Sequence, residues 1–575
     1  MKVSIAWLKE LVDLKVSIEE LTRLLPLRTI GLKEVTDDFI ELDMKGYNRA
    51  DLLSMRGVAR EVSAITDSEV KFTPESQFVW EEKKLPKVKV EIEDNKLCQV
   101  YCVAKIEGLK VKSSSKEWVK KLIDSGIRSI DNVTDVTNLI MLEYGQTIHA
   151  FDAAKVADET MIVRLAKGGE EFVTLDGKSR KLTKEDLLIT DPKGILSLSG
   201  IMGGKNSEIT GNTNTILLEV AIFDPVSIRK SSQRFSLYSE ASKRIQHGLT
   251  KANLMQALSA AIKMYEQLGG KLTAITLTGN LEDIPKKIKL TQEKINSLIG
   301  VDISPDQVKS SLKKFGFEMS LQEGQSQTWE VTVPYWRLDI AIEEDLIEEV
   351  ARMYGYEKIP ANELKGELPE KVDQTLPNFI YDLKKALADA GLTEVQTYSF
   401  YSSKSFSILQ PPPSTLIKVA NPISSETEYL RNNVWPNLVE VVGRNLRNGF
   451  KDIAIFEIGK AYTPAENGLP AEQYRLSLVI CNGTENPISE FSVILSAAKN
   501  LIKLDPSASP QDDKGADDTR GEPEKRIFHP TRFKNLEYKG KVIGALAEVH
   551  PRILNEYRIE KRVAILEISI EPFMS

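Results

Sequence analysis

The sequence is poor in the residue types that form disulfides and structural metal sites. Only three cysteines and four histidines occur among 575 residues. Cys98, Cys102 and Cys481 fit no zinc signature, and three thiols cannot all pair within one chain. We therefore expect reduced, buried thiols in a cytoplasmic protein. The histidines, at positions 149, 247, 529 and 550, also lack the spacing of a zinc site.

Long apolar runs and an excess of basic charge are missing too. No stretch approaches the roughly 18 apolar residues of a membrane-spanning helix, and the first residues, MKVSIAWLKELVDL, lack the apolar centre of a signal peptide. We expect no membrane association. The 76 Lys and Arg residues oppose 83 Asp and Glu residues, which gives a net charge of −7. Such a chain is not suited to indiscriminate nucleic-acid binding, although local basic patches can still occur.

The length and the apolar pattern predict a multidomain α+β protein. A chain of this length commonly holds three to five domains. Helical spacing predicts helices over 4–26 and 50–66, and alternation predicts strands within 86–112. Residues 287–360 combine helices with the strand WEVTVPYW, and helices mix with strands again from 375 onward. The segment 504–526 is rich in Pro, Asp, Gly, Ser and Lys, which predicts a disordered insertion.

An unusual concentration of acids lies in WRLDIAIEEDLIEEVARMYGY, residues 336–356. On a helical wheel Asp345, Glu348 and Glu349 are neighbours on the face opposite the apolar residues, and Asp339 lies just before the helix. Arg352 is the basic residue on that face. One interpretation is a solvated polar face with acids near the helix N-terminus. The other is a site for a hard cation such as Mg²⁺.

A second polar group surrounds His149 in DVTNLIMLEYGQTIHAFD, residues 135–152. Thr137 and Asn138 are among the hydrogen-bonding residues close by in the sequence. His149 is either a structural histidine satisfied by a neighbour or part of a pocket that positions water or a substrate hydroxyl.

Two further segments carry possible chemistry. SLSGIMGGKNS, residues 197–207, is not a P-loop, because three residues rather than four separate Gly200 from Gly204 and Asn206 follows the lysine. A glycine turn that offers backbone N–H groups to a ligand stays open. In TILLEVAIFDP, residues 215–225, Glu219 interrupts an apolar strand. Its carboxylate either points to solvent or lies in a pocket, where it would need a partner.

Together these motifs resemble one family. NVTDVTNLIMLEYGQTIHAFD, LSGIMGG and ILLEVAIFDP resemble the editing domain of the beta subunit of bacterial phenylalanyl-tRNA synthetases. VPYWRLDIAIEEDLIEEVARMYGYEKIP resembles its helix-turn-helix-like domain, and NPISSETEYLRNNVWPNLVEVVGRN with ALAEVHPRILNEYRI its catalytically silent synthetase-like fold. The resemblance implies four domains: a helical N-terminal platform (1–85), a mixed α/β editing domain (86–285), a helix-turn-helix-like domain (286–362) and a class II synthetase-like antiparallel sheet domain (370–575).

The resemblance also implies the sites. The acidic helix would bind Mg²⁺ at the contact with an alpha subunit, through Asp339, Asp345, Glu348 and Glu349. The editing pocket would hydrolyse tyrosine mischarged onto the tRNA for phenylalanine. Such editing is needed because a phenylalanine site cannot strongly reject an isostere that only adds a hydroxyl. Its residues would be Thr137, Asn138, His149, Ser199, Gly200 and Glu219. Ser199 stands where the family usually has alanine.

The implied partners are an alpha subunit, in an alpha-2 beta-2 assembly, and tRNA. The alpha subunit would carry the ATP and phenylalanine chemistry, so ATP is a substrate there and Mg²⁺ is shared. Compared with the family, we expect a shortened form that lacks the OB-fold tRNA-binding module and the C-terminal anticodon-binding module. Two other functions stay open: a stand-alone hydrolase of mischarged tRNA, and a nucleic-acid-binding module built on the helices of 287–360. The acidic helix argues against the second, since it would face phosphates with like charge.

Overall fold

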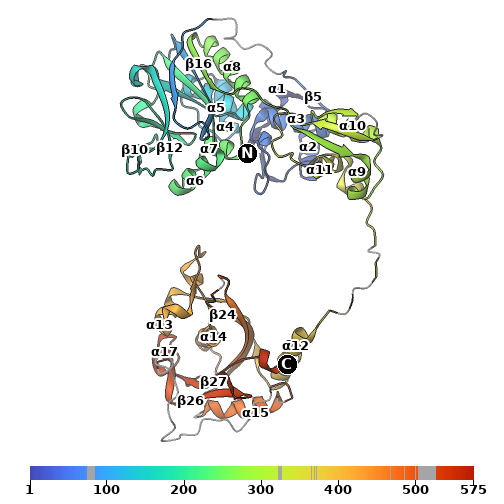
Figure 1. Cartoon of the computed structure of the whole chain (residues 1–575), viewed down its shortest axis with the longest axis vertical. Helices are drawn as coiled ribbons and strands as arrows, with labels where there is room; N and C mark the ends of the chain where they lie inside the picture. Colours follow the sequence, from blue (N-terminus) through green and yellow to red (C-terminus); the bar gives the residue numbers. More distant parts are fainter. Residues whose placement is uncertain are drawn as a thin grey trace. The chain divides into compact units, whose positions relative to one another are not determined.

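The computed structural model describes residues 1–73, 84–321, 327–363, 366–367, 370, 372–466, 468–484, 486–498, 500–502 and 526–574. The chain divides into two compact units, residues 1–363 and 364–575, which Figure 1 colours from blue at the N-terminus to red at the C-terminus. Helices and strands mix in both units, which confirms the α+β class. The predicted disordered segment, 504–526, lies outside the described residues except for its last residue.

The N-terminal part of the first unit differs from the predicted helical platform. Instead of one helical segment over 4–26 there are two helices, because Val12 is extended and pairs with Val70, and Ser17 caps a new helix. The link between the helices and the next helical stretch forms a hairpin that joins a small sheet of order β1-β4-β3. The elements are β1 Lys2–Ser4, α1 Ile5–Leu11, β2 Val12–Asp13, α2 Ile18–Arg28, β3 Leu32–Val35, β4 Phe39–Leu42, α3 Met55–Thr66 and β5 Glu69–Val70.

The middle of the first unit contains two sheets. The first has the order β16-β7-β15-β8 and the second the order β14-β13-β12-β9-β6. The strands are β6 Lys89–Ile92, β7 Cys98–Glu107, β8 Ile148–Asp152, β9 Thr160–Leu165, β12 Leu187–Thr190, β13 Ile195–Leu198, β14 Met202–Gly203, β15 Ile216–Phe223 and β16 Lys271–Gly279. The helices are α4 Lys116–Asp124, α5 Asn132–Tyr144, α6 Pro225–Phe235, α7 Glu240–His247 and α8 Lys251–Gln267; a small β10–β11 hairpin, Glu171–Val173 with Ser179–Lys181, lies between β9 and β12.

Strand β15 determines where its single acid lies. Every residue of β15 is buried, because the strand is covered on both faces. Leu217 and Ala221 pack in one apolar cluster with residues of the second sheet. Leu218 and Val220 pack in another cluster with α5 and α8. Side chains alternate between the faces of a strand, so Glu219 points toward the second sheet and the solvent-facing interpretation is wrong.

The last part of the first unit carries the acidic helix. Its sheet has the order β17-β19-β18, and the apolar residues of α11, Leu346, Ile347 and Val350, pack in the same core as that sheet. The elements are β17 Lys287–Thr291, α9 Gln292–Ile299, α10 Pro305–Lys314, β18 Glu318–Leu321, β19 Thr328–Thr332 and α11 Glu343–Tyr354. The helix predicted from the apolar spacing is thus confirmed.

The second unit is built on a six-stranded sheet of order β20-β24-β25-β28-β27-β26, antiparallel except for the β20–β24 pair. Its strands are β20 Thr393–Glu394, β24 Ile453–Thr463, β25 Ala471–Cys481, β26 Phe528–Tyr538, β27 Lys541–Val549 and β28 Ala564–Ser569. The helices are α12 Thr375–Asp389, α13 Ser403–Leu409, α14 Trp435–Arg447, α15 Glu490–Ala497 and α17 Pro551–Glu556. No helix among the described residues of either unit is long and apolar enough to cross a membrane.

Candidate functional site

Glu219 and His149 lie side by side on the face of the first sheet that meets the second sheet. Strands β15 and β8 are antiparallel, and the register places Glu219 directly opposite His149. Glu219 is 5% exposed, whereas His149 is half-buried and packs edge-on against Phe151 with ring centroids 4.5 Å apart. The structure therefore brings together two of the predicted editing-site residues, although 70 positions separate them in the chain.

Burial controls the charge of both residues. It raises the pKa of the Glu219 carboxyl from 4.5 to about 8 and lowers the pKa of the His149 imidazole from 6.5 to about 4. No hydrogen bond or ion pair to another described residue satisfies Glu219. At pH 7 the site thus holds a neutral imidazole and a carboxyl that is mostly protonated. The anionic Glu219 expected from the sequence is therefore corrected.

The Ser199–Gly200 turn covers the same face. It connects β13 to β14, and Gly200 has φ = +63°, a conformation that favours glycine. A Cβ at Gly200 would come 3.2 Å from the ring of Phe223, which follows Glu219 on the same face of β15. Ser199 is fully buried and its Oγ has no hydrogen-bond partner among the described residues. An unpaired buried hydroxyl here is consistent with a site that binds a polar ligand.

The turn does not offer its backbone N–H groups in the way that a phosphate-binding loop would. The N–H of Ser199 donates to the Leu187 carbonyl, that of Ile201 to Leu198 and that of Gly204 to Leu196, over 2.8 to 3.0 Å. These three donors are therefore used within the second sheet and its turn. The turn acts through its shape and through the Ser199 hydroxyl.

Gly203 is a residue that sequence reasoning missed. It lies on β14, and a Cβ there would come within 2.7 Å of His149 Nε2. Only a residue without a side chain leaves the imidazole where it is. The pair of glycines at 203 and 204 was a visible signal, but nothing in the sequence indicated that β14 would lie against β8.

We expect Gly203→Ala to displace His149 and destabilise the chain by about 1–3 kcal/mol, the usual effect of overpacking a well-packed site. The matched control is Gly211→Ala, because a Cβ at Gly211 has no atom within 4 Å. Urea denaturation followed by circular dichroism measures both changes. Equal stability of the two variants would contradict the contact.

Thr137 and Asn138 do not lie on the sheet face that carries Glu219 and His149. Both are on α5, whose residues Val133, Val136 and Ile140 pack in the cluster on the other face of the first sheet. The Thr137 hydroxyl donates to the Thr134 carbonyl of its own helix at 2.7 Å. No hydrogen bond joins either residue to Glu219 or His149 in the described part of the chain. Their role in a pocket therefore stays a prediction.

The acidic helix is not the uniformly solvated face of the first interpretation. Glu349 is 2% exposed and lies between two arginines. Its carboxylate accepts hydrogen bonds from Arg337 at 2.6 and 2.8 Å and from Arg352 at 2.5 and 2.9 Å. Burial alone would raise the pKa of Glu349, but the bonds and charges of the two arginines outweigh it and lower the pKa. The sequence missed Arg337 because that residue precedes the helix.

The other three acids of this set have different surroundings. Both oxygens of Asp339 accept from Arg337, at 2.7 and 2.9 Å. Asp345 Oδ2 accepts the N–H groups of Ala341 and Ile342 and so caps the helix. Glu348 is exposed. No group of three or more His, Cys, Asp or Glu residues among those described is arranged to hold a metal ion.

These surroundings decide which acids fit a magnesium ion. Asp339 and Glu349 do not fit as ligands in this arrangement, since arginines occupy all their oxygens. Asp345 Oδ1 and the Glu348 carboxylate stay available, one helical turn apart. Mg²⁺ often takes one or two carboxylates and keeps several waters, so these two residues fit part of such a site.

The arginine network continues into the N-terminal part of the chain. Glu61 on α3 is 3% exposed and accepts from Arg49 at 2.8 Å and from Arg352. Thr29 at the end of α2 donates to the same carboxylate at 2.7 Å. The network thus fixes α11 to α2 and α3. The sequence gave no sign of Glu61, because it is one acid among the polar residues of an ordinary amphipathic helix.

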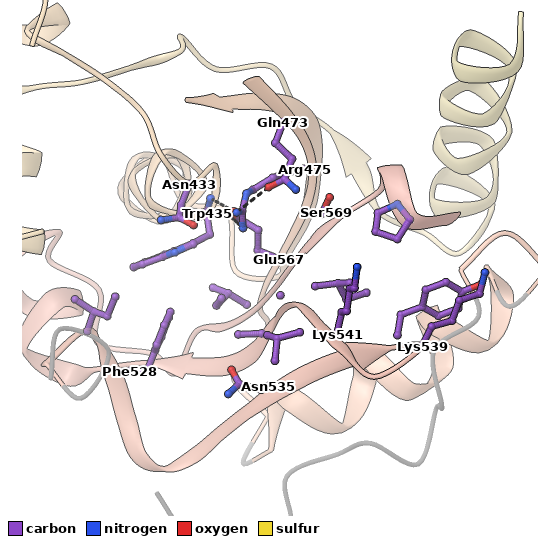
Figure 2. A pocket seen from close by; sticks show the side chains of 18 residues that line it. Asn433, Trp435, Gln473, Arg475, Phe528, Asn535, Lys539, Lys541, Glu567 and Ser569 are labelled. Atoms are coloured by element: carbon purple, nitrogen blue, oxygen red, sulfur yellow. Dashed lines mark hydrogen bonds and ion pairs between the residues drawn. The ribbon is translucent and has the colours of Figure 1, made fainter. Parts of the chain in front are cut away.

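The second unit contains a cavity of about 720 Å³ over the six-stranded sheet. Figure 2 shows Trp435 and Phe528 at one end of it and Lys539 and Lys541 at the other. The rings of Trp435 and Phe528 have centroids 5.3 Å apart. Arg475 lies between the two ends, with one nitrogen 3.6 Å from Glu567.

Glu567, the acid of this cavity, has a structural task. Its Oε2 accepts the N–H groups of Val434 and Trp435, at 2.9 and 2.7 Å, at the start of α14. Burial raises its pKa, and Arg475 and these two backbone N–H groups oppose that effect. The Glu567 carboxylate therefore caps a helix through Oε2, and its Oε1 lies 3.6 Å from Arg475.

Three family models match this chain. The B3/4 domain matches residues 97–270, the tRNA synthetase B5 domain residues 288–356, and the phenylalanyl tRNA synthetase beta chain CLM domain residues 359–570. The first match contains Glu219 and His149, and the second contains α11. The matched domains place the chain among aminoacyl-tRNA synthetase subunits.

Individual relatives show to which synthetase family the chain belongs. The phenylalanine–tRNA ligase beta subunit of Syntrophotalea carbinolica is 32% identical over 563 residues, which are 95% of this chain and 68% of that protein. The one from Lactococcus lactis is 33% identical over 93% of this chain and 67% of that protein. The chain belongs to the phenylalanine–tRNA ligase beta subunit family. An N-terminal fragment of the phenylalanyl-tRNA synthetase beta subunit from Pyrococcus horikoshii is 20% identical, with a TM-score of 0.35, over 62% of this chain and 99% of that chain.

Proposed function

We propose that this chain works with a separate alpha subunit in an alpha-2 beta-2 assembly that charges tRNA with phenylalanine. In this proposal ATP and phenylalanine react on the alpha subunit, and this chain supplies a scaffold, part of the interface and proofreading. Family membership supports the ligase role. The arrangement of Glu567 supports a silent second unit, because that acid is held by the start of α14.

The domain assignment is part of the proposal. Residues 1–85 are a platform of helices and a small sheet, 86–285 a tRNA-editing domain, 286–362 a domain with the acidic helix, and 370–575 the synthetase-like domain. The extents of the three matched family models support it.

The proofreading proposal rests on one observation: an unpaired, buried carboxyl at Glu219 beside a neutral imidazole at His149. A tyrosine side chain that entered this site would offer a hydroxyl to Glu219, and a phenylalanine side chain would leave the carboxyl unpaired. Sites that hydrogen-bond a substrate hydroxyl discriminate strongly against the analogue without it. His149, more exposed than Glu219, is placed to orient the water that attacks the ester.

Positioning accounts for this hydrolysis better than strong base catalysis does. With its pKa lowered to about 4, His149 is a weak base at pH 7. A neutral imidazole can still accept a hydrogen bond from water and hold it against the ester carbonyl. The water oxygen forms the new bond to carbon, and the ribose oxygen leaves with a proton.

Deacylation of tyrosyl-tRNA by this chain combined with its alpha subunit tests the proposal. We expect tyrosyl-tRNA to be hydrolysed much faster than phenylalanyl-tRNA by the same preparation. Hydrolysis of both at the uncatalysed rate would contradict the proofreading role and leave the ligase role intact.

We also propose that Asp345 and Glu348 bind Mg²⁺ together with groups of the alpha subunit. When bound, the ion would neutralise acidic charge at the contact between the subunits. Asp339 and Glu349 then act through Arg337, which holds the start of α11 in place. This assignment keeps the predicted site but gives two of its four acids a positioning task.

The double variant Asp345→Asn with Glu348→Gln tests the metal proposal. Asparagine can still accept the two backbone N–H groups that Asp345 accepts. We expect assembly with the alpha subunit to require about tenfold more Mg²⁺, measured by analytical ultracentrifugation across a magnesium series. The control is Glu344→Gln, an exposed acid of the same helix that pairs with Lys294. An unchanged magnesium requirement in the double variant would remove Mg²⁺ from α11.

A further inference from the structure

Tyr101 carries a buried hydroxyl that the fold does not satisfy. The residue lies on β7 and is fully buried, and its hydroxyl has no hydrogen-bond partner among the described residues. Buried tyrosine hydroxyls usually find a partner. On the other face of the same sheet, the buried Tyr265 follows that rule and donates to the Val133 carbonyl at 2.8 Å. The Tyr101 hydroxyl therefore needs a hydrogen-bond partner that the described residues do not supply.

The strand register places Tyr101 beside Glu219. On the paired strands β7 and β15, Tyr101 is opposite Ala221 and Val103 is opposite Glu219. Residues two apart on a strand share a face, so Tyr101 is the diagonal neighbour of Glu219, a separation that long side chains bridge. After burial, the Glu219 charge is the largest cause that raises the pKa of Tyr101.

The Tyr101 hydroxyl and the Glu219 carboxyl on this face, and the Ser199 hydroxyl of the turn in the second sheet, have no hydrogen-bond partner among the described residues. The residue of β15 directly opposite Tyr101 is Ala221, the smallest of the residues that β15 places on this face. Leaving a buried polar group without a partner is costly, and a ligand hydroxyl could satisfy two of them at once.

We propose that Tyr101 determines specificity in the editing site, where its hydroxyl donates a hydrogen bond to the phenolic oxygen of the bound tyrosine. The phenol donates its own proton into a hydrogen bond with Glu219. Each partner then has a complementary role, since the phenolic oxygen both accepts and donates. The proposal rests on the editing function above and extends it to a residue outside the predicted set.

This arrangement gives Tyr101→Phe two effects of opposite sign. The substitution removes one oxygen atom and keeps the ring. We expect deacylation of tyrosyl-tRNA to fall about tenfold, the effect of one lost hydrogen bond, while the slow hydrolysis of phenylalanyl-tRNA stays unchanged. The melting temperature should stay equal or rise, because the variant no longer buries an unsatisfied hydroxyl.

The experiment compares Tyr101→Phe with Tyr265→Phe in the complete assembly with the alpha subunit. Tyr265→Phe removes the same atom where it is hydrogen-bonded, so its melting temperature should fall while tyrosyl-tRNA deacylation stays at the wild-type rate. If the wild type deacylates tyrosyl-tRNA and Tyr101→Phe does so equally well, the inference is wrong and the editing function stands.

Free L-tyrosine separates failure of the inference from failure of the editing function. The melting temperature is measured on this chain without the alpha subunit, because the alpha subunit itself would bind phenylalanine. We expect L-tyrosine, and not L-phenylalanine, to raise the melting temperature of the wild-type chain, and Tyr101→Phe to lose this shift. If the wild type does not deacylate tyrosyl-tRNA but shows this Tyr101-dependent shift, the inference survives and editing fails. Absence of both deacylation and shift would overturn both.

Discussion

Glu349→Ala should destabilise the first unit by about 3–5 kcal/mol, the usual cost of removing one partner from a buried ion pair. The variant leaves Arg337 and Arg352 buried without the carboxylate that they share. Arg352 would keep its ion pair with Glu61, and among the described residues Arg337 would keep its ion pair with Asp339 and its contact with the ring of Phe317. A loss of this size is a large fraction of the stability of a typical domain.

Glu348→Ala is the matched control, because Glu348 is the preceding residue of the same helix and is exposed. Surface substitutions of this kind usually change stability by less than about 0.5 kcal/mol. Urea denaturation in the absence of the alpha subunit and of Mg²⁺ measures both variants. Equal stability would show that Glu349 does not anchor α11, and would restore it as a candidate metal ligand.

Glu219→Gln should change both the chemistry and the pH dependence of stability. The pKa of Glu219 is about 8 in the folded chain and near 4.5 when unfolded. The folded chain therefore binds this proton more tightly, so its stability is fully present below pH 4.5 and is lost as pH rises through 8. With about 1.4 kcal/mol per pKa unit, the wild type should lose a few kcal/mol across this window.

The glutamine variant lacks this titration, so its stability relative to the wild type should increase between pH 5 and pH 9. The other titratable groups near Glu219 are His149, Tyr101 and Cys98, and all three are present in both proteins. His149 has the opposite dependence, because its lowered pKa removes stability as pH falls from 6.5 toward 4. Denaturation midpoints at several pH values therefore isolate Glu219 by difference.

The same variant should lose part of its preference for tyrosyl-tRNA over phenylalanyl-tRNA. A protonated carboxyl can donate and accept hydrogen bonds through its two oxygens, whereas the amide of glutamine has one oxygen that can accept from the phenol. Charging with phenylalanine should continue at the wild-type rate. A pH-independent stability difference, or undiminished discrimination, would mean that Glu219 is not the buried carboxyl of this site.

The spacing of apolar residues within single elements was sufficient to predict some of these features. The apolar spacing of α11 predicted its helix and its buried face, and the mixed pattern predicted the α+β class. It failed where a second element decides the environment. The wheel placed Glu349 on the polar face and left a solvated face and a metal site open, but Arg337, which lies outside the helix, and Arg352 bind its carboxylate. The sequence of β15 alone could not decide whether Glu219 faces solvent or a pocket. The structure shows that it is buried, because other elements cover both faces of the strand.

The contacts that the sequence could not predict join residues far apart in the chain. Gly203 lies against His149 through the approach of two sheets, and Tyr101 lies beside Glu219 through strand register. No spacing rule encodes either contact. The predicted single helix over 4–26 failed for a related reason, since the pairing of Val12 with Val70 interrupts it.

Phenylalanine charging tests the central claim most directly. The tRNA is incubated with ATP, Mg²⁺ and phenylalanine together with this chain alone, with the cognate alpha chain alone, and with both. Membership of the beta subunit family predicts charging only when both chains are present. Charging by this chain alone, or by the alpha chain at the same rate without it, would contradict the account.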